Sequence, residues 1–220
     1  MSADVLTLYS YWRSSACYRV RIALHLKELE FVTVPVHLIN NGGEQHAEAF
    51  RDVNPQELIP VLMHGDRVMR QSLAIIEYLD EIFTESAALM PSIARDRQRC
   101  RAIAHMVAMD IHPLGNLRVQ QYLETKLGAD SDAREDWTRH WIRHGFDAVE
   151  RVLADSSSTG AFCEGDTPTM ADCCLVPQVY NARRFGIDLQ AFPTLARIEA
   201  NCLALDAFQR AKPEAQPDAP

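Results

Sequence analysis

The sequence predicts an α/β domain at the N-terminus that is followed by an all-α domain. Two observations predict this fold class. Strand-like and helical runs alternate up to about residue 84, and from residue 92 onward mainly helical periodicities follow. The chain has 220 residues, which is enough for two small domains or one large one. We therefore expect domains at residues 1–84 and 92–220, joined by a linker.

The N-terminal elements are expected in the order β-α-β-α-β-β-α. Residues 5–9 alternate in character and are rich in strand formers, whereas residues 15–28 carry apolar side chains at helical spacing. The remaining elements are strands at 30–36, 61–64 and 67–70, a short helix around 46–52 and a helix at 72–83. A single sheet with helices on both faces would bury these elements.

Helical periodicity accounts for most of the second domain. The expected helices span residues 95–108, 112–127, 132–154, 169–184 and 193–210. Thr169 and Asp172 have the spacing of a capping box, in which each side chain bonds the other residue's backbone N–H, and we interpret this pair as structural. The proline-rich end at 212–220 is expected to be weakly ordered.

The net charge, the apolar runs and the cysteines of the chain argue against several classes of protein and of partner. A formal charge of −8 argues against a general nucleic-acid or anionic-membrane binder, because such partners need a basic surface. The start, MSADVLTLYS, lacks the features of a signal peptide, and no apolar run approaches the roughly 18 residues of a membrane span. The six cysteines form no CxxC pair, which favours reduced thiols. We expect a cytoplasmic protein without nucleic-acid or membrane partners.

The stretch 11-YWRSSACYRVRIAL-24 contains the first candidate site. Ser14 and Ser15 lie where a strand gives way to a helix, and free backbone N–H groups and the positive end of the helix dipole meet there. Such a place can stabilise a thiolate, to which a serine hydroxyl can donate. The serines could equally be plain helix caps. The residues alone leave open both interpretations, and also whether a reactive sulfur would be that of Cys17 or of a ligand.

Six motifs occur along the chain in the order 12-WRSSACYRVRIAL-24, 54-NPQELIPVL-62, 71-QSLAIIEYLDE-81, 111-IHPLGNL-117, 165-GDTPTMADCCLVPQV-179 and 183-RRFGIDL-189. Together they resemble the glutathione transferase superfamily, and most of all its zeta class, the maleylacetoacetate isomerases. The resemblance covers nearly the whole chain. It implies a thioredoxin-like N-terminal domain, an all-helical C-terminal domain, glutathione as cofactor and a homodimer.

The resemblance also implies which residues bind glutathione. Ser14 would be the principal hydrogen-bond donor to the thiolate, with Ser15 and Arg13 beside it as catalytic residues. A cis peptide at Ile59-Pro60 would aim the backbone of Ile59 at the cysteinyl part of glutathione. The positions that match contacts of the γ-glutamyl end or other glutathione contacts are Gln45, Gln71 and Ser72.

Further positions match the substrate pocket of the family. Arg13 and Arg184 would bind the carboxylates of a small dicarboxylate substrate, because guanidinium groups bind carboxylates through two parallel hydrogen bonds. The adjacent Arg183 is expected to face elsewhere. His112 and Asn116, at the start of the helix expected at 112–127, match polar positions of the cleft that contact glutathione or substrate.

The activity implied by the resemblance is cis–trans isomerisation. Glutathione would add to maleylacetoacetate and leave as fumarylacetoacetate forms, in the catabolism of tyrosine and phenylalanine. The alternatives are a maleylpyruvate isomerase, a transferase or dehalogenase acting on α-halo acids, and a non-enzymatic binding protein. Leu117 favours maleylacetoacetate over maleylpyruvate, because some maleylpyruvate-isomerising relatives have an arginine near this point.

Two further features bear on the chemistry. His140 and His144 have the i, i+4 spacing of a metal site but no acidic third ligand, so we expect no metal. The turn also departs from the family's Ser-Ser-Cys, since Ala16 stands at the cysteine position and Cys17 follows it. We interpret Cys17 as a packed thiol and expect the working sulfur to be that of glutathione, held by Ser14.

Overall fold

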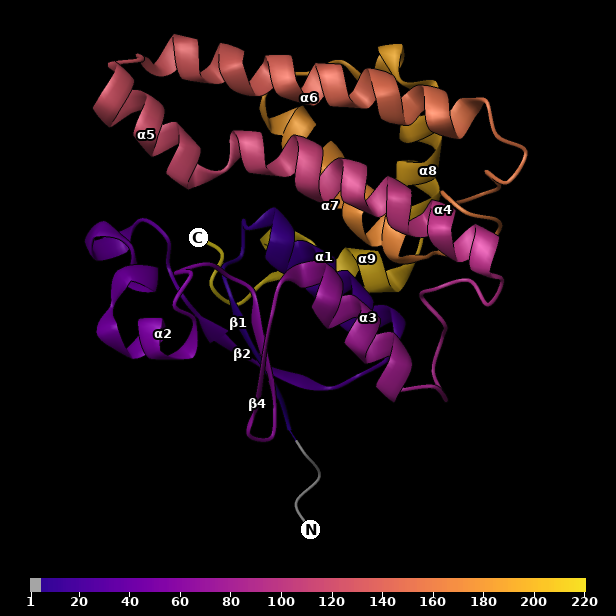
Figure 1. Ribbon diagram of the computed structural model, residues 1–220, viewed down its shortest axis with the longest axis horizontal. Coiled ribbons are helices and arrows are strands. Elements are labelled where there is room, and N and C mark those ends of the chain that lie inside the picture. Colours follow the sequence, from indigo (N-terminus) through magenta and orange to yellow (C-terminus); the bar gives the residue numbers. More distant parts are fainter. Residues whose placement is uncertain (1–4) are drawn as a thin grey trace. The chain divides into compact units, whose positions relative to one another are not determined.

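The computed structural model describes residues 5–220, which form two compact units (Figure 1). The N-terminal unit contains the described residues up to Met90 together with Leu203–Pro220. The helical unit is Pro91–Cys202. Each unit has its own buried side chains, and each is described separately below.

The N-terminal unit is built on a mixed sheet. Within the described residues its strands are β1 (Leu6–Ser10), β2 (Phe31–Pro35), β3 (Val61–His64) and β4 (Arg67–Arg70). Their order in the sheet is β2-β1-β3-β4. β1 runs parallel to β2 and antiparallel to β3, and β3 pairs with β4 in an antiparallel hairpin. Together with the helices of this unit, which are given below, the strands follow each other along the chain in the predicted order β-α-β-α-β-β-α, which is therefore confirmed.

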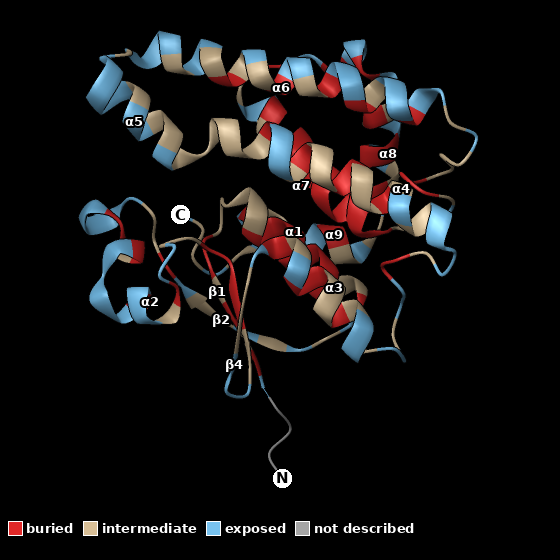
Figure 2. Cartoon of the chain, in the orientation of Figure 1, coloured by how far each residue is buried: buried red, intermediate tan, exposed pale blue. Residues whose placement is uncertain are grey.

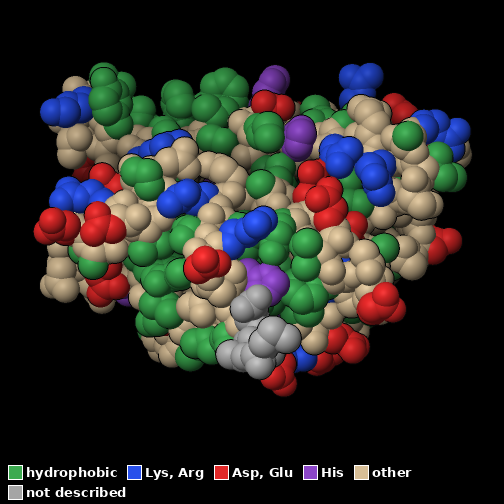
Figure 3. Space-filling model, turned by 60° about the horizontal axis from the view of Figure 1, so that its bottom comes forward, with side chains coloured by type: hydrophobic (Ala, Val, Ile, Leu, Met, Phe, Trp, Pro, Cys, Tyr) green, Lys and Arg blue, Asp and Glu red, His purple; other side chains and the backbone are tan. Residues whose placement is uncertain are grey.

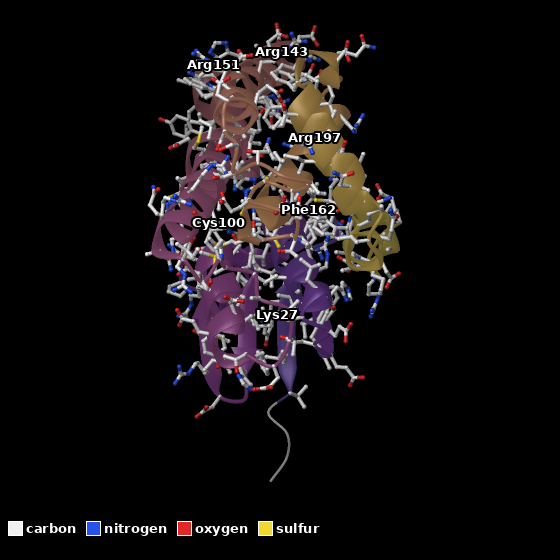
Figure 4. All side chains as sticks on the ribbon, turned by 90° about the vertical axis from the view of Figure 1, so that its right-hand side faces the viewer. Lys27, Cys100, Arg143, Arg151, Phe162 and Arg197 are labelled. Carbon is white, nitrogen blue, oxygen red and sulfur yellow. The ribbon has the colours of Figure 1, made fainter. Side chains whose placement is uncertain are left out.

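The helices of this unit are α1 (Ser15–Leu26), α2 (Glu48–Val53), α3 (Ser72–Ile82) and the C-terminal α9 (Asp206–Ala211). α1 is buried along most of its length, as the red ribbon of Figure 2 shows, and it contacts both α3 and α9. Lys27 follows α1 and is buried with its ammonium group bonded to the carbonyl of Ala87 at 3.0 Å (Figure 4). This contact joins the end of α1 to the segment after α3.

The helical unit contains α4 (Ala94–His105), α5 (Leu117–Leu127), α6 (Ser131–Ala154), α7 (Met170–Arg184) and α8 (Pro193–Leu203). α7 is its most buried helix and contacts α4. The predicted capping box at its start is present, with the Thr169 and Asp172 side chains each bonded to the other's backbone N–H. Cys100, on α4, is also fully buried within this unit (Figure 4).

The structure divides the helix expected at 112–127. After α4 the chain forms a π-helical turn at Met106–Ile111 and a 3₁₀ turn at His112–Gly115, and α5 begins only at Leu117. Asn116 is the N-cap of α5, and its side chain accepts a hydrogen bond from the N–H of Arg118 at 3.2 Å. A side-chain cap at this point starts a new helix, because it satisfies an N–H group that a continuous helix would have bonded internally.

The C-terminal segment corrects the predicted domain boundaries. Residues 203–220 were expected in the helical domain, but they belong to the N-terminal unit. Phe208 and Ala211 are fully buried there, and the Ala211 carbonyl accepts a hydrogen bond from Arg21 Nε at 3.0 Å. Within residues 212–220, which were expected to be weakly ordered, the structure has a turn in which Gln216 Nε2 donates to the carbonyl of Lys212 at 2.7 Å. The helical spacing of apolar residues predicts that a helix forms, but it does not predict against which of the two units the helix packs.

The surface carries both signs of charge. On the face drawn in Figure 3, basic and acidic side chains are interspersed among apolar ones. None of the helices described between residues 5 and 220 combines the length and apolar character that crossing a membrane requires. All six cysteines lie in the described part of the chain and are buried, and no disulfide joins any two of them.

Candidate functional site

The register of the sheet brings four connecting segments to one edge of the sheet, where the ends of the strands meet. Ser10 lies opposite Pro35, and Tyr9 lies opposite Val61. Val61 in turn lies opposite Arg70. The segments after β1, β2 and β4 and the segment before β3 therefore start or end at the same edge of the sheet. These segments contain Ser14 and Ser15, Gln45, Gln71 and Ser72, and Ile59.

Ser14 is the N-cap of α1, as the structural interpretation of this turn predicted. Its Oγ accepts a hydrogen bond from the N–H of Cys17 at 3.3 Å, and its own N–H donates to the carbonyl of Tyr11 at 3.0 Å. A hydroxyl that accepts through oxygen still has its O–H to donate. Ser14 can therefore cap the helix and hydrogen-bond a thiolate at the same time, while Ser15 forms the first residue of α1.

Cys17 lies beneath this turn and is fully buried. It packs in a cluster with Tyr11, Val36 and Ile59, among others. Burial raises the pKa of the Cys17 thiol, although the nearby Arg21 guanidinium acts in the opposite direction. A buried neutral thiol is a poor nucleophile. Cys17 is thus a packed thiol, and glutathione as the source of the working sulfur stays a prediction.

Ile59 precedes β3, and the peptide bond to Pro60 is cis. This confirms the conformation that the sequence resemblance implied. Ile59 is buried in the same cluster as Cys17. Ile59, in the segment before β3, therefore packs in the same cluster as a residue of the first turn of α1.

The N-terminus of α3 forms the second helix end at this edge. Gln71 has a left-handed backbone (φ 72°), and its side chain donates to Gln56 Oε1 at 2.9 Å instead of capping the helix. The first N–H groups of α3 therefore have no side-chain cap, and uncapped N–H groups at a helix start suit a carboxylate. Ser72, the first helical residue, is buried with 6% of its surface exposed.

Arg19 is a further residue of this site, which the sequence analysis did not single out. It is 2% exposed, and its Nη1 donates to the Oγ of Ser72 at 3.2 Å. Because the arginine occupies the oxygen as an acceptor, the Ser72 O–H is left to donate to an anion. The signal in the sequence was an arginine within the apolar part of the first helix, where a charged side chain requires a specific partner.

Gln45 is 5% exposed in the loop after β2. Its Nε2 lies 2.9 Å from His46 Nε2, whereas its Oε1 is buried and has no hydrogen-bond partner within residues 5–220. A buried acceptor without a donor is costly unless a ligand supplies one. This oxygen therefore fits a bound molecule that carries N–H groups, such as a peptide-like cofactor.

The arginine before Ser14 is half-buried. The guanidinium of Arg13 lies 5.3 Å from the centroid of the Trp12 ring, which is cation–π distance. A cation next to Ser14 can bind the carboxylate of a substrate or stabilise negative charge that develops during reaction.

Three predicted residues belong to the helical unit. His112 begins the 3₁₀ turn, Asn116 caps α5, and Arg184 is the last residue of α7. Arg184 is exposed and donates to Asn181 Oδ1 at 3.1 Å. Arg183 instead pairs with the buried Glu199, with Nε 3.1 Å from Oε1. The two adjacent arginines therefore have different surroundings, as expected.

The two histidines of α6 stack on each other. The ring centroids of His140 and His144 are 6.2 Å apart. Among residues 5–220 no group of three or more His, Cys, Asp or Glu side chains is arranged to hold a metal ion.

Known proteins are similar to this chain in architecture and in sequence. The profile of the glutathione S-transferase N-terminal domain matches residues 8–87. The probable maleylacetoacetate isomerase of Vibrio cholerae serotype O1 is 50% identical over 214 residues, which cover 97% of this chain and 98% of that protein. The holo structure of a maleylpyruvate isomerase, a bacterial zeta-class glutathione transferase, has a TM-score of 0.94 and 47% identity, over 97% of this chain and 100% of that one. The chain belongs to the zeta-class glutathione transferase family.

A second solved structure that is similar to this chain contains ligands. The maleylacetoacetate isomerase of Methylobacterium extorquens AM1, with bound malonate and glutathione, has a TM-score of 0.93 and 40% identity, over 97% of this chain and 99% of that one. The predicted fold class, a thioredoxin-like domain followed by helices, is thus confirmed as the glutathione transferase fold.

Proposed function

We propose that this zeta-class glutathione transferase isomerises maleylacetoacetate to fumarylacetoacetate with glutathione as cofactor. The observation that carries the proposal is the start of α1. There the Ser14 hydroxyl lies at a helix N-terminus while the neighbouring protein thiol, Cys17, is buried. This arrangement stabilises an anionic sulfur that arrives from outside the chain. The similarity to maleylacetoacetate isomerases supports the choice of substrate.

The residues of the N-terminal unit would hold glutathione along the edge of the sheet. When bound, glutathione supplies the thiolate that adds reversibly to a cis double bond and so permits rotation about it. Ser14 donates its O–H to the sulfur, and the N–H groups at the start of α1 add to the stabilisation. Ser72 and the uncapped start of α3 bind the γ-glutamyl carboxylate, and Gln45 Oε1 accepts from an N–H group of the cofactor. The roles of Ser15, Ile59 and Gln71 are backbone and side-chain contacts to the same molecule.

Arginines would bind the substrate. Maleylacetoacetate carries two carboxylates, and Arg13 and Arg184 are the two cations that we assign to them. Arg13 also stabilises the enolate that forms on addition. His112 and Asn116 are assigned to polar contacts with the cofactor or the substrate.

The wider setting is part of the same proposal. The reaction belongs to the catabolism of tyrosine and phenylalanine, in the cytoplasm, and is carried out by a homodimer. The mass of the protein in solution, measured by light scattering, tests the last of these.

A rate comparison tests the proposed reaction. Turnover of maleylacetoacetate and of maleylpyruvate is measured with and without glutathione, and free thiol is titrated at the end. We expect glutathione-dependent turnover that is faster on maleylacetoacetate, with no net loss of thiol. Turnover that does not need glutathione, or none on either substrate, would sink the isomerase proposal.

Maleylpyruvate isomerase remains the second candidate, because a protein of that activity is 47% identical to this chain. Leu117 is the residue that favours maleylacetoacetate. A faster rate on maleylpyruvate would select the second candidate. Consumption of glutathione in proportion to product, with α-halo acids as substrates, would instead identify a transferase or dehalogenase.

A further inference from the structure

Two charged side chains, one of them near the other end of the sequence, hydrogen-bond the backbone just before Ser14. Asp218, near the C-terminus, accepts a hydrogen bond from the N–H of Trp12 through Oδ2 at 2.8 Å. Arg21, on α1, donates to the carbonyl of Trp12 at 2.9 Å and to the carbonyl of Tyr11 at 3.4 Å. The two peptide groups that precede Arg13 are therefore bonded to side chains from two segments of the chain.

We infer that Asp218 is a positioning residue of the glutathione site, which together with Arg21 holds the Trp12 backbone and thereby the place of Arg13 and Ser14. This inference rests on the proposed function of the site. Asp218 itself does not need to contact glutathione or the substrate.

Arg21 and Asp218 carry opposite charges; Arg21 is buried and Asp218 is half-buried. Arg21 is fully buried, and its Nη1 also bonds Ser10 Oγ at 3.2 Å. Burial lowers the pKa of Arg21, and Cys17, Tyr18 and Asp218 act in the opposite direction. Asp218 Oδ1 is buried without a hydrogen-bond partner inside the described part of the chain. A carboxylate in such a place needs compensating charge, which Arg21 supplies.

The segment that carries Asp218 is itself attached to the N-terminal unit. Gln216 Nε2 donates to the carbonyls of Arg210 at 2.9 Å and Lys212 at 2.7 Å, and its own carbonyl accepts from the N–H of Ala219 at 3.1 Å. In Figure 1 the C-terminus returns to the side of the unit where β1 leads into α1. A turn that these hydrogen bonds stabilise therefore holds Asp218 next to the backbone of Trp12.

The carbonyl group of Tyr11 connects these hydrogen bonds to Ser14. The oxygen of Tyr11 accepts from Arg21 and also from the N–H of Ser14 at 3.0 Å. A shift of the Trp12 peptide would therefore move the Ser14 hydroxyl. A hydrogen bond to a thiolate weakens steeply with distance and angle, so a small shift affects the charged sulfur more than the rest of the cofactor.

The test uses the full-length protein with Asp218→Ala and Asp218→Asn, the second of which keeps an acceptor oxygen. The control is Asp206→Asn, which removes the same charge from the same segment at a side chain that is 82% exposed. Three quantities are measured: the pKa of the bound glutathione thiol, from thiolate absorbance against pH; kcat for maleylacetoacetate; and the dissociation constant of S-methylglutathione, which has no thiol to ionise.

We expect Asp218→Ala to raise the pKa of the bound thiol and to lower kcat by about 10-fold, within the range of up to about 100-fold for a misplacement of about 1 Å. Asp218→Asn should have a smaller effect and Asp206→Asn none. Binding of S-methylglutathione and the melting temperature should stay close to those of the wild type.

Two results would overturn the positioning role and leave the proposed function intact. One is a wild-type pKa and kcat in Asp218→Ala. The other is a large fall in melting temperature with an unchanged pKa of the bound thiol, which would make Asp218 merely structural. A wild-type protein that binds no glutathione would contradict the proposed function, and this inference with it.

Discussion

Ser14 and Cys17 are three positions apart at the start of α1, but they differ in accessibility and in chemistry. Ser14 is half-buried with an O–H to donate, whereas Cys17 is fully buried with a raised thiol pKa. We expect Ser14→Ala to lower kcat/KM by roughly 10- to 100-fold, because a hydrogen bond to a charged group contributes about 1.5–3 kcal/mol. Cys17→Ala should retain most of the activity and lose about 1 kcal/mol of stability through lost packing.

Steady-state kinetics and urea unfolding of both variants check this expectation. Ser14→Thr, which keeps a hydroxyl, is the control for loss of the helix cap. An inactive Cys17→Ala with a normal Ser14→Ala would reverse the assignment of the sulfur.

Arg183 and Arg184 form a natural pair of test and control. Arg184→Gln should raise KM for the dicarboxylate about 10-fold or more, because a charge-assisted pair is lost. Arg183→Gln should lower the melting temperature instead, because Glu199 would be left buried without its partner. Kinetics and thermal unfolding of the two variants separate these outcomes, and an unchanged KM in Arg184→Gln would remove Arg184 from the substrate site.

At the scale of elements, the capping box at the start of α7 is a structural device. The Asp172 carboxylate is fully buried and accepts from the N–H groups of Cys163 and Thr169, both at 2.8 Å. Asp172→Ala should lower the free energy of unfolding by roughly 2–5 kcal/mol, because two buried donors lose their acceptor. Thr169→Ala should cost about 1 kcal/mol. Urea unfolding measures both, and KM for glutathione should not change in the folded fraction.

The end of α1 contains a group that makes stability depend on pH. Burial, with a smaller contribution from Arg210, lowers the pKa of His25 from 6.5 to about 4. The unfolded chain then binds more protons than the folded one between these two values. The contribution of His25 to stability is present above pH 6.5 and is lost as the pH falls towards 4.

We therefore expect His25→Gln to flatten the fall in melting temperature over this pH range. The exposed His140→Gln is the control. An identical pH profile for wild type and His25→Gln would contradict the shift. Partial solvent exposure of the ring limits the size of the effect.

At the scale of the whole molecule, the N-terminal unit is discontinuous in the sequence, since it is completed by Leu203–Pro220. A fragment that ends at residue 90 would lack Phe208, which is fully buried, and the Ala211 carbonyl that accepts from Arg21. We expect this fragment to be unfolded or to expose apolar surface. The same fragment joined to residues 203–220 through a flexible linker should regain a cooperative thermal transition, followed by circular dichroism. A cooperative transition in the fragment alone would contradict this role of the C-terminal segment.

Much of the fold could be predicted because its signals are local. The alternation in residues 5–9, the helical spacing after Ser15 and the capping box of Thr169 depend on neighbours within about one turn. The division of the helix expected at 112–127 was missed, because Asn116 is an ordinary polar residue until its backbone adopts a capping conformation. Among the site residues, Ser14 was found from its place at a strand-to-helix junction, whereas Arg19 was not.

The sequence by itself determined the order of the elements, the serine at the start of α1 and, through its six motifs, the family. The tertiary structure decided which distant residues meet. Arg19 bonds Ser72 across 53 positions, Arg21 bonds Ala211 across 190, and Trp12 bonds Asp218 across 206. The physical reason is that periodicity and capping depend on interactions between near neighbours, which the order of residues specifies directly. A buried arginine or carboxylate finds its partner only when the sheet register and helix packing bring the two segments together.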